Sequence, residues 1–477
     1  MKQLLLLLLI PAMYACAPSP VSLAQIDAEE TAGNFTRAAY LIDLYIAEQR
    51  PPEATVYDLQ WRKEKMRRIA LEFDQTKNNV RDYIKTYYPD VTDEMLSKWE
   101  AEKSLEALTI DGERKYFSEA APNLFRIDRE AAARKREINP PAPDKKEETL
   151  KQHLPEVIAS AMKTKKPLSA PVRMKVSYQV TLKPNAVPAG ETVRCWLPYL
   201  REDIRRQTNV RLLAVNDSNY VISPPEYAHR TLYMEKTARQ DEPLTFAYEF
   251  SYQSAAEWFG LETKTLMPYD TESEVYKTCT AERPPHIVFS DSIKAISKRI
   301  VGNETNPYRK MKKIFTWIDE TFPWAGATDY STIDNIPAYV LENRHGDCGQ
   351  VTLLFMTLAR YNGIPARWQS GFMMHPHRTN LHDWSEFYLE GVGWIPMDES
   401  FGVNRFSEDE HVKYFYTNGL DAYRWIVNSD YSQPLFPTKI YPRSDLIDFQ
   451  RGELEWIGGN LFYDQWSWDF DVSYDEN

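Results

Sequence analysis

The sequence predicts a multidomain α+β protein with an N-terminal helical region, a β-sandwich domain and a mixed α+β core. Apolar residues recur at helical spacing through much of residues 22–165, and they alternate with polar residues in residues 170–260. Helices followed by strands then return in residues 265–430. A chain of 477 residues is also too long for one ordinary hydrophobic core, so we expect several domains.

The chain begins with a short basic segment and a short apolar run, Leu4–Leu9, which is too short to cross a membrane as a helix. A small residue, Ala15, directly precedes Cys16, as in a bacterial lipoprotein signal, although the two residues before Ala15 depart from the usual pattern. We therefore expect residues 1–16 to form a lipoprotein signal peptide in which Cys16 is lipidated. A plain secretory signal cut nearby is the alternative.

This signal predicts an exported protein that is anchored to the bacterial cell envelope by lipid alone. The residues just after Cys16 carry no acidic run that would mark surface export, so we expect the protein to face the periplasm. A net charge of −12 gives no indication of a nucleic-acid partner. The sequence leaves the oligomeric state open.

The helical region, residues 22–165, shows amphipathic helices at about 28–48 and 57–74, and Thr92 is placed to cap a third. A proline-rich charged linker follows at 139–148 and leads into a short helix. We interpret this region as a helical cap or docking module without chemistry of its own.

Residues 170–260 are typical of a β-sandwich, because Met174, Val176, Tyr178 and Val180 alternate with polar residues and similar runs follow. This domain is expected to serve as a scaffold or a wall beside the substrate. Residues 431–477 are rich in Trp and Tyr, too aromatic for disorder, so we expect a C-terminal extension that packs on the core.

Cys348 is the cysteine with the most informative surroundings. It follows Gly346-Asp347, precedes Gly349-Gln350, and opens an apolar run typical of a buried helix. The positive end of a helix dipole favours a thiolate, so a nucleophile is expected here. Cys195 is expected to be a buried small side chain, and a Cys195–Cys279 disulfide is an open alternative.

A thiolate nucleophile needs a base, and that base needs a carboxylate to orient it. His382 lies just before one predicted strand, and Asp398 lies at the end of the next. Adjacent antiparallel strands would place them side by side, facing the helix that carries Cys348. Asp383 is a rival for the orienting role, but neighbouring strand residues point to opposite faces, which favours Asp398.

Five sequence blocks now carry a family resemblance. They are Gly346-Asp347-Cys348-Gly349, Gly363-Ile364-Pro365-Ala366-Arg367, Ser370-Gly371-Phe372, His382-Asp383-Trp384 and Trp394-Ile395-Pro396-Met397-Asp398. Together they resemble the core of the transglutaminase-like superfamily over residues 295–405. The resemblance implies a papain-like α+β fold for the catalytic domain, residues 265–430, and a triad of Cys348, His382 and Asp398. Many family members have a small residue at Asp383, a departure that leaves the triad intact.

The groups that would complete the site are less specific in sequence. The backbone N–H of Cys348 is the expected first oxyanion donor, and Asn335, Tyr330, Gln350 and Trp324 are the candidates for a second. Trp384 could shield the His–Asp pair from water. His375 and His377 match no standard metal spacing, so we interpret them as a solvated loop and expect neither a metal nor a cofactor.

These features predict a cysteine-dependent acyl-transfer enzyme that hydrolyses an amide bond in a peptide or protein. Cys348 would attack the carbonyl, His382 would protonate the leaving amine, and Asp398 would hold His382. Amine transfer of the protein-glutamine transglutaminase type is one alternative, less favoured because no amine site is evident. A non-catalytic peptide-binding module of the envelope is the other.

Overall fold

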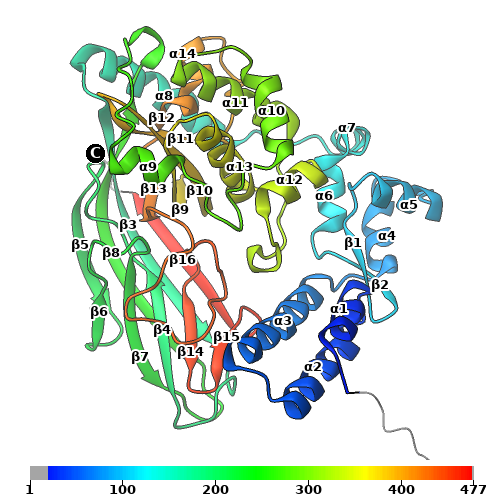
Figure 1. Cartoon of the computed structure of the whole chain (residues 1–477). Coiled ribbons are helices and arrows are strands. Elements are labelled where there is room, and N and C mark those ends of the chain that lie inside the picture. Colours follow the sequence, from blue (N-terminus) through cyan, green and yellow to red (C-terminus); the bar gives the residue numbers. More distant parts are fainter. Residues whose placement is uncertain (1–19, 475–477) are drawn as a thin grey trace, which may run out of the picture. The chain divides into compact units, whose positions relative to one another are not determined.

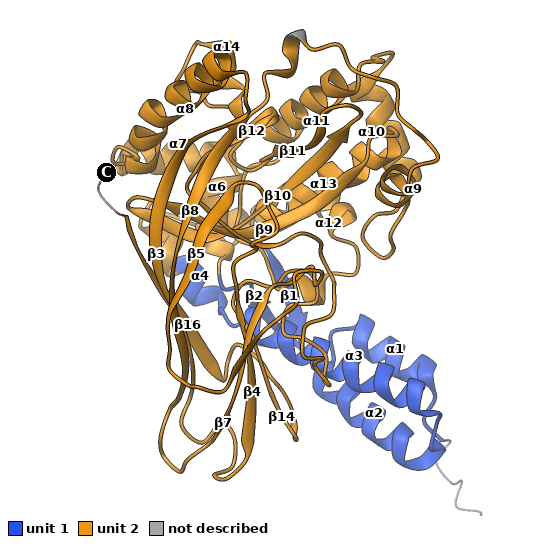
Figure 2. Ribbon diagram, turned by 90° about the vertical axis from the view of Figure 1, so that its left-hand side faces the viewer, with its two compact units in different colours: residues 1–81, 106–118 blue, residues 82–105, 119–477 orange. Residues whose placement is uncertain are grey.

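The computed structural model describes residues 20–474, so Cys16 and the predicted signal peptide lie outside the described residues. The chain forms two compact units (Figure 2). The first contains residues 1–81 and 106–118, and the second contains residues 82–105 and 119–477. Within the described range, no helix is both long and apolar enough to cross a membrane.

The first unit is a small helical module with one hairpin. Its elements are α1 (Leu23–Thr31), α2 (Phe35–Gln49), α3 (Glu53–Glu72), β1 (Ala107–Ile110) and β2 (Glu113–Tyr116), and α4 (Lys77–Lys85) crosses its boundary. The buried side chains of Ile26, Leu41 and Leu59 join the three helices. The hairpin was not predicted, since its strands are short and largely exposed.

The helix expected over 28–48 is divided into α1 and α2 at Gly33. This residue has φ +77°, which glycine adopts without strain. A Cβ there would lie 2.1 Å from the carbonyl oxygen of Thr109 in β1, so the close approach of β1 requires a glycine. The helical spacing of apolar residues continues across Gly33, so the sequence pattern did not reveal the turn between the two helices.

The second unit begins with a series of helices. They are α5 (Asp93–Ala101), α6 (Ala120–Ile127), α7 (Arg129–Ile138) and α8 (Lys145–Thr164). The predicted cap of α5 is confirmed, since the Thr92 side chain accepts a hydrogen bond from the Met95 N–H. Asp144 caps α8 in the same way, so that helix starts inside the segment expected to be a linker.

The β-sandwich consists of two sheets (Figure 1). Its first strands are β3 (Leu168–Leu182), β4 (Thr192–Pro198), β5 (Gln207–Val215), β6 (Tyr220–Ile222), β7 (Thr231–Thr237) and β8 (Leu244–Trp258). The alternation predicted for β3 is confirmed, because every second residue from Met174 to Val180 is buried while the polar residues that alternate with them are exposed. The apolar faces of the two sheets meet in one core.

The C-terminal segment contributes strands to both sheets of the sandwich. These strands are β14 (Glu453–Trp456), β15 (Gly459–Leu461) and β16 (Trp466–Tyr474), drawn in red in Figure 1. β16 pairs with β3 from Trp466↔Leu182 to Tyr474↔Met174, and β14 pairs with β4. A segment expected to pack on the core therefore completes the sandwich as well.

The core domain holds helices on one side of an antiparallel sheet of order β11-β10-β9-β13. Its helices are α9 (Glu274–Thr280), α10 (Asp291–Val301), α11 (Pro307–Thr321), α12 (Ile336–Asn343), α13 (Cys348–Tyr361) and α14 (Glu410–Lys413), with single 3₁₀ turns η1 (Leu261–Thr263), η2 (Tyr330–Thr332) and η3 (Phe415–Thr417). Its strands are β9 (Ala366–His375), β10 (Arg378–Leu389), β11 (Gly393–Met397) and β13 (Arg424–Asn428), while β12 (Gly419–Leu420) pairs with β8. The predicted α+β class is confirmed.

Candidate active site

Cys348 is the first residue of α13, and a capping box fixes the start of that helix. The Asp347 side chain accepts a hydrogen bond from the Gln350 N–H at 3.0 Å. The Gln350 side chain accepts in return from the Asp347 N–H at 3.2 Å. Two N–H groups that a helix start leaves unpaired are thereby satisfied, and the sulfur is held at the positive end of the helix.

The thiol of Cys348 meets a carboxyl group. Its Sγ lies 3.3 Å from Oδ2 of Asp383 on β10, and the S–H donates to that oxygen. A Cβ on Gly349 would lie 2.4 Å from the Tyr330 hydroxyl and 2.7 Å from Asp383 Oδ2. Glycine at position 349 therefore permits both groups to approach the start of α13.

These neighbours change the chemistry expected of the sulfur. Burial, followed by the charges of Asp383 and Asp347, raises the pKa of Cys348 well above its ordinary value. Burial also raises the pKa of Asp347 to about 6. The helix dipole was expected to favour a thiolate, but desolvation and two nearby carboxyl groups outweigh that partial charge here. Cys348 is a protonated thiol in this arrangement.

His382 and Asp398 form the pair that the order of strands predicts. His382 Nε2 lies 2.8 Å from Asp398 Oδ2, with His382 on β10 and Asp398 directly after β11. Burial lowers the pKa of His382, and Asp398 only partly offsets this effect. Burial alone would raise the pKa of Asp398, but His382 and Arg424 together lower it. The result is a neutral imidazole beside an ionised carboxylate.

Cys348 and the His382–Asp398 pair meet opposite faces of β10. Asp383 and Ser385 face α13, where Ser385 hydrogen-bonds to Glu399 and Glu399 accepts from Thr352 of the helix. His382 and Trp384 project from the other face, because successive strand residues alternate. Across residues 20–474, no hydrogen bond joins Cys348 to His382. The prediction that the His382–Asp398 pair faces α13 is therefore wrong in this structure. Because neighbouring strand residues point to opposite faces, an Asp383 that faces α13 leaves His382 on the face away from the helix.

Two of the predicted oxyanion candidates lie at the start of α13. Tyr330 donates its hydroxyl hydrogen to Asp347 Oδ1 at 2.5 Å, so it supports the cap of the helix. Gln350 is fully buried, and its Nε2 has no hydrogen-bond partner in the described part of the chain. Gln350 therefore retains a free donor two residues after Cys348.

The third oxyanion candidate, Asn335, and the predicted shield, Trp384, have structural partners, and the fourth candidate, Trp324, is exposed with the Arg126 guanidinium 5.1 Å from its ring centre. Asn335 caps α12, since its Oδ1 accepts from the Ala338 N–H at 2.8 Å. Its Nδ2 donates to the carbonyl oxygen of His286 at 3.3 Å. Trp384 is buried beside His382, and its indole N–H donates to Gln369 at 2.7 Å. Trp384 thus covers His382, as the predicted shielding requires.

Sequence reasoning missed two polar residues of the C-terminal segment that reach this site. Gln450 Nε2 donates to Asp383 Oδ1 at 2.8 Å and to the His382 carbonyl oxygen at 3.1 Å. Asp448 Oδ1 accepts from Ser370 at 2.5 Å and from Asn428 at 2.9 Å. The aromatic content of the segment indicated that it packs inward, but nothing local indicates which polar partners it meets.

A buried charged cluster adjoins the His382–Asp398 pair and was also missed. Arg424 Nη2 lies 2.6 Å from Asp421 Oδ2, and His375 Nε2 lies 3.0 Å from Asp421 Oδ1. His375 was expected in a solvated loop with His377. It is instead the last residue of β9 and fully buried, and burial lowers its pKa to about 4. β9 is buried along nearly its whole length, so its last residue is enclosed as well.

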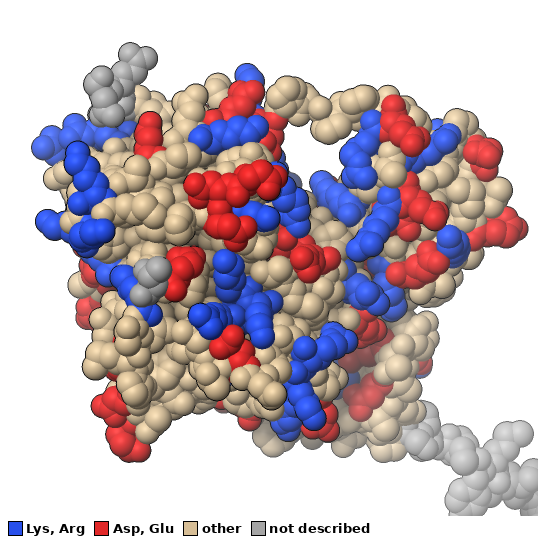
Figure 3. Space-filling model, turned by 90° about the horizontal axis from the view of Figure 1, so that it is seen from above, with Lys and Arg blue, Asp and Glu red and all other residues tan. Residues whose placement is uncertain are grey.

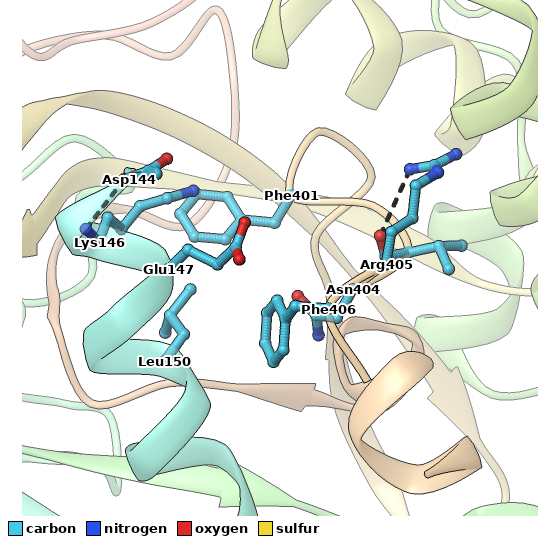
Figure 4. A pocket seen from close by; sticks show the side chains of 9 residues that line it. Asp144, Lys146, Glu147, Leu150, Phe401, Asn404, Arg405 and Phe406 are labelled. Atoms are coloured by element: carbon cyan, nitrogen blue, oxygen red, sulfur yellow. Dashed lines mark hydrogen bonds between the residues drawn. The ribbon is translucent and has the colours of Figure 1, made fainter. Parts of the chain in front are cut away.

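A pocket of about 370 Å³ lies beside this cluster, between the start of α8 and the loop that follows Asp398 (Figure 4). Lys146 Nζ lies 4.0 Å from the centre of the Phe401 ring, and the Arg424 guanidinium lies 4.3 Å from it. The same ring is 4.9 Å from the ring of His382. Phe401 therefore connects the pocket to the buried histidine.

Comparison with known families agrees with the geometry. The family model of the transglutaminase-like superfamily matches residues 294–399, which include Cys348, His382 and Asp398. This segment of the chain is similar to the transglutaminase-like superfamily. The sandwich and the N-terminal helices lie outside the matched segment.

Two curated relatives share part of the sequence. An uncharacterized protein of Haemophilus influenzae is 26% identical over 212 residues, which cover 38% of this chain. The protein YebA of Bacillus subtilis, also uncharacterized, is 21% identical over 131 residues, or 24% of this chain. The match spans 56% of the Haemophilus protein and 18% of the Bacillus protein, so each relative extends well beyond it.

Two crystal structures are similar at low identity. A candidate cysteine protease from Cytophaga hutchinsonii matches 65% of this chain and 93% of its own, with 13% identity and a TM-score of 0.44. The periplasmic domain of TgpA from Pseudomonas aeruginosa matches 47% of this chain and 88% of its own, with 14% identity and a TM-score of 0.26.

Proposed function

We propose that this protein is a cysteine-dependent acyl-transfer enzyme that hydrolyses an amide bond in a peptide or protein. The observation that carries the proposal is the 2.8 Å contact between His382 and Asp398 in the core that begins α13 with Cys348. The match of residues 294–399 to the superfamily model supports a cysteine-dependent enzyme in general. The bond that is cleaved and the substrate are our proposal.

In the proposed reaction, the sulfur of Cys348 attacks the carbonyl carbon, and its proton passes to His382. A C–S bond forms, the C–N bond breaks, and the amine leaves with the proton from His382. Water then attacks the thioester, so that a C–O bond replaces the C–S bond and the sulfur regains a proton. Asp398 keeps His382 oriented and stabilises its charged form.

The resting geometry places one requirement on this reaction. Cys348 contacts Asp383, whereas His382 lies on the other face of β10. The proposal therefore includes a movement on substrate binding that brings the sulfur and the imidazole together.

Two donors near Cys348 are suited to an oxyanion. The N–H of Cys348 lies at the start of α13, where backbone N–H groups are free of intrahelical partners. Gln350 Nε2 is the second donor we propose, because it is buried and has no other partner among residues 20–474. Asn335 is less suited, since both ends of its amide group already have partners.

A peptide substrate is also compatible with the surface charge. Figure 3 shows Lys and Arg side chains interspersed with Asp and Glu over the face it presents, without an expanse of one sign. Nucleic-acid partners recognise a concentrated basic surface, so we propose none. We also propose that lipid on Cys16 anchors the protein to the envelope.

The experiment that tests the function compares wild type with Cys348→Ala on a mixed peptide library, with and without added primary amines, by mass spectrometry. Cys279→Ala is the matched control, because Cys279 is another free thiol of the same chain. Cleavage by wild type and the control, lost in Cys348→Ala, supports hydrolysis. Amine-linked products lost in the same variant would replace hydrolysis with amine transfer. Identical spectra for all three proteins would overturn the proposal in favour of a binding module.

A further inference from the structure

Asp383 is held from both sides in a way that the proposed reaction does not use. Its Oδ2 accepts from the Cys348 thiol at 3.3 Å, and its Oδ1 accepts from Gln450 Nε2 at 2.8 Å. The side chain is 4% exposed. One carboxyl group thus lies between the sulfur of α13 and the C-terminal segment, and each of its oxygens accepts a hydrogen bond from one of these two sides.

A second buried carboxyl group lies behind the first. Asp448 is 1% exposed, and its Oδ1 accepts from Ser370 and Asn428. Its Oδ2 has no donor in the described chain unless a proton joins it to Asp383. Burial, then the charge of Asp448, raises the pKa of Asp383 well above its ordinary value, and burial raises that of Asp448 too. Two carboxylates this close cannot both ionise at low cost, so the pair retains one proton.

We propose that Asp383, fixed in place by Asp448 and Gln450, keeps the proton on the Cys348 sulfur in the resting protein and so sets the pH at which the thiol becomes a nucleophile. Asp383 contacts the sulfur directly, while Asp448 and Gln450 are positioning residues that act through it. The inference rests on the proposed function only in taking Cys348 as the nucleophile.

The charged groups around the sulfur favour this assignment. Asp347 caps α13 and accepts from Tyr330, so its charge is partly satisfied by the hydroxyl. Arg451 and Asp445 of the C-terminal segment act on Asp347 with opposite signs. Asp383 is the carboxyl group that hydrogen-bonds to the sulfur, and its charge exceeds that of Asp347 in its effect on Cys348.

Replacing Asp383 and replacing Asp448 are expected to shift the midpoint pH of Cys348 ionisation in opposite directions. In Asp383→Asn, the shared negative charge stays on Asp448, further from the sulfur, so the thiolate forms more easily. In Asp448→Asn, the remaining charge resides wholly on Asp383, beside the sulfur, so the thiolate forms less easily. A structural role alone would not separate the two variants in this way.

The test measures alkylation of Cys348 by iodoacetamide from pH 6 to 12, with mass spectrometry of the Cys348 peptide in the full chain. Cys348 is partly exposed as a residue, which gives a small reagent a route to it. We expect Asp383→Asn to lower the midpoint pH by at least one unit, which raises the rate at pH 7 about tenfold. We expect Asp448→Asn to raise the midpoint. Asp383→Ala, which places a small residue there, is expected to follow Asp383→Asn.

Controls keep the result interpretable. Asp469→Asn changes an exposed acidic residue of the same C-terminal segment and is expected to leave the Cys348 midpoint as in wild type. Cys279 in the same digest reports any general loss of structure, and thermal melting checks that each variant folds. An unchanged or raised midpoint in folded Asp383→Asn and Asp383→Ala would overturn the proposal, as would shifts of equal sign in the Asp383 and Asp448 variants. Alkylation does not require the protein to turn over a substrate. If the midpoint pH shifts as expected but the protein cleaves no peptide, the proposed hydrolysis is rejected and the role of Asp383 stands.

Discussion

The guanidinium of Arg424 lies 3.0 Å from Oδ2 of Asp398, and both side chains are fully buried. The same oxygen accepts from His382, so the carboxylate that orients the histidine also has a permanent cation beside it. Arg424 keeps Asp398 ionised, even though burial acts in the opposite direction. The state of the His382–Asp398 pair therefore depends on a residue of β13.

Replacing Arg424 by methionine should destabilise the protein strongly. The change leaves Asp398 and Asp421 buried without their cation, and breaking a buried ion pair in this way costs about 3–5 kcal/mol. Urea unfolding followed by circular dichroism measures the loss. Arg405→Met is the matched control, because Arg405 pairs with Asp319 but is 66% exposed. Its cost is expected to stay below about 1 kcal/mol. Equal losses in the two variants would contradict the prediction.

His382→Ala should separate turnover from resting thiol reactivity. If His382 is the base, peptide hydrolysis falls by about 10³-fold or more. In the resting structure, however, the partner of Cys348 is Asp383, so the midpoint pH of Cys348 alkylation should remain that of wild type. Kinetics on a cleaved peptide and an alkylation profile give the two readouts. A shifted midpoint would mean that His382 already acts on the sulfur before substrate binds.

Glu399→Gln should change how stability depends on pH. Burial raises the pKa of Glu399 well above its ordinary value, so the folded protein holds a proton that the unfolded chain releases above about pH 4.3. The stabilisation from that proton is complete below this pH and declines as pH rises towards the folded pKa, by up to about 1.4 kcal/mol per unit. The amide has no such dependence.

Urea titrations of wild type and Glu399→Gln at pH 5, 6, 7 and 8 test this expectation. The free energy of unfolding of the variant should rise relative to wild type at each step. Ser385 and Thr352, which hydrogen-bond to Glu399, can also bond to the amide, so the comparison isolates the ionisation. If the free energies of unfolding of wild type and Glu399→Gln changed in parallel from pH 5 to 8, Glu399 would not hold its proton over this pH range.

Lipidation at Cys16 is testable without knowledge of the substrate. Cells that express wild type or Cys16→Ala are labelled with an azide-bearing fatty acid, and the purified protein is coupled to a fluorophore. We expect the label in wild type and none in Cys16→Ala, because the thiol is the acceptor of the lipid. Cys348→Ala should be labelled like wild type. Label retained in Cys16→Ala would reject the lipoprotein signal.

Local signals explain why parts of the site could be predicted. Asp347 caps α13 and Asn362-Gly363 ends it, so the helix begins and ends where the sequence indicates. The pairing of β10 with β11 brings His382 to Asp398, since the two strands are joined by a tight turn. These relationships depend on residues that are close in sequence.

The remainder depends on distant contacts that sequence patterns do not record. Gln450 lies 67 residues from Asp383 along the chain, yet it donates to that carboxyl group. Which face of β10 meets α13 also decides that the thiol contacts Asp383 and not His382. That choice follows from how the helix packs on the sheet, which an alternating pattern alone cannot determine.

The pairing of β3 with β16 sets an order for synthesis. β3 leaves the ribosome while the whole core and its partner strand are still to be translated, so one of its edges must wait for the C-terminal segment. Asp448 and Gln450 emerge in that same late stretch. A nascent chain thus carries Cys348 and Asp383 for some time before Gln450 and Asp448, the residues that position Asp383, have been translated.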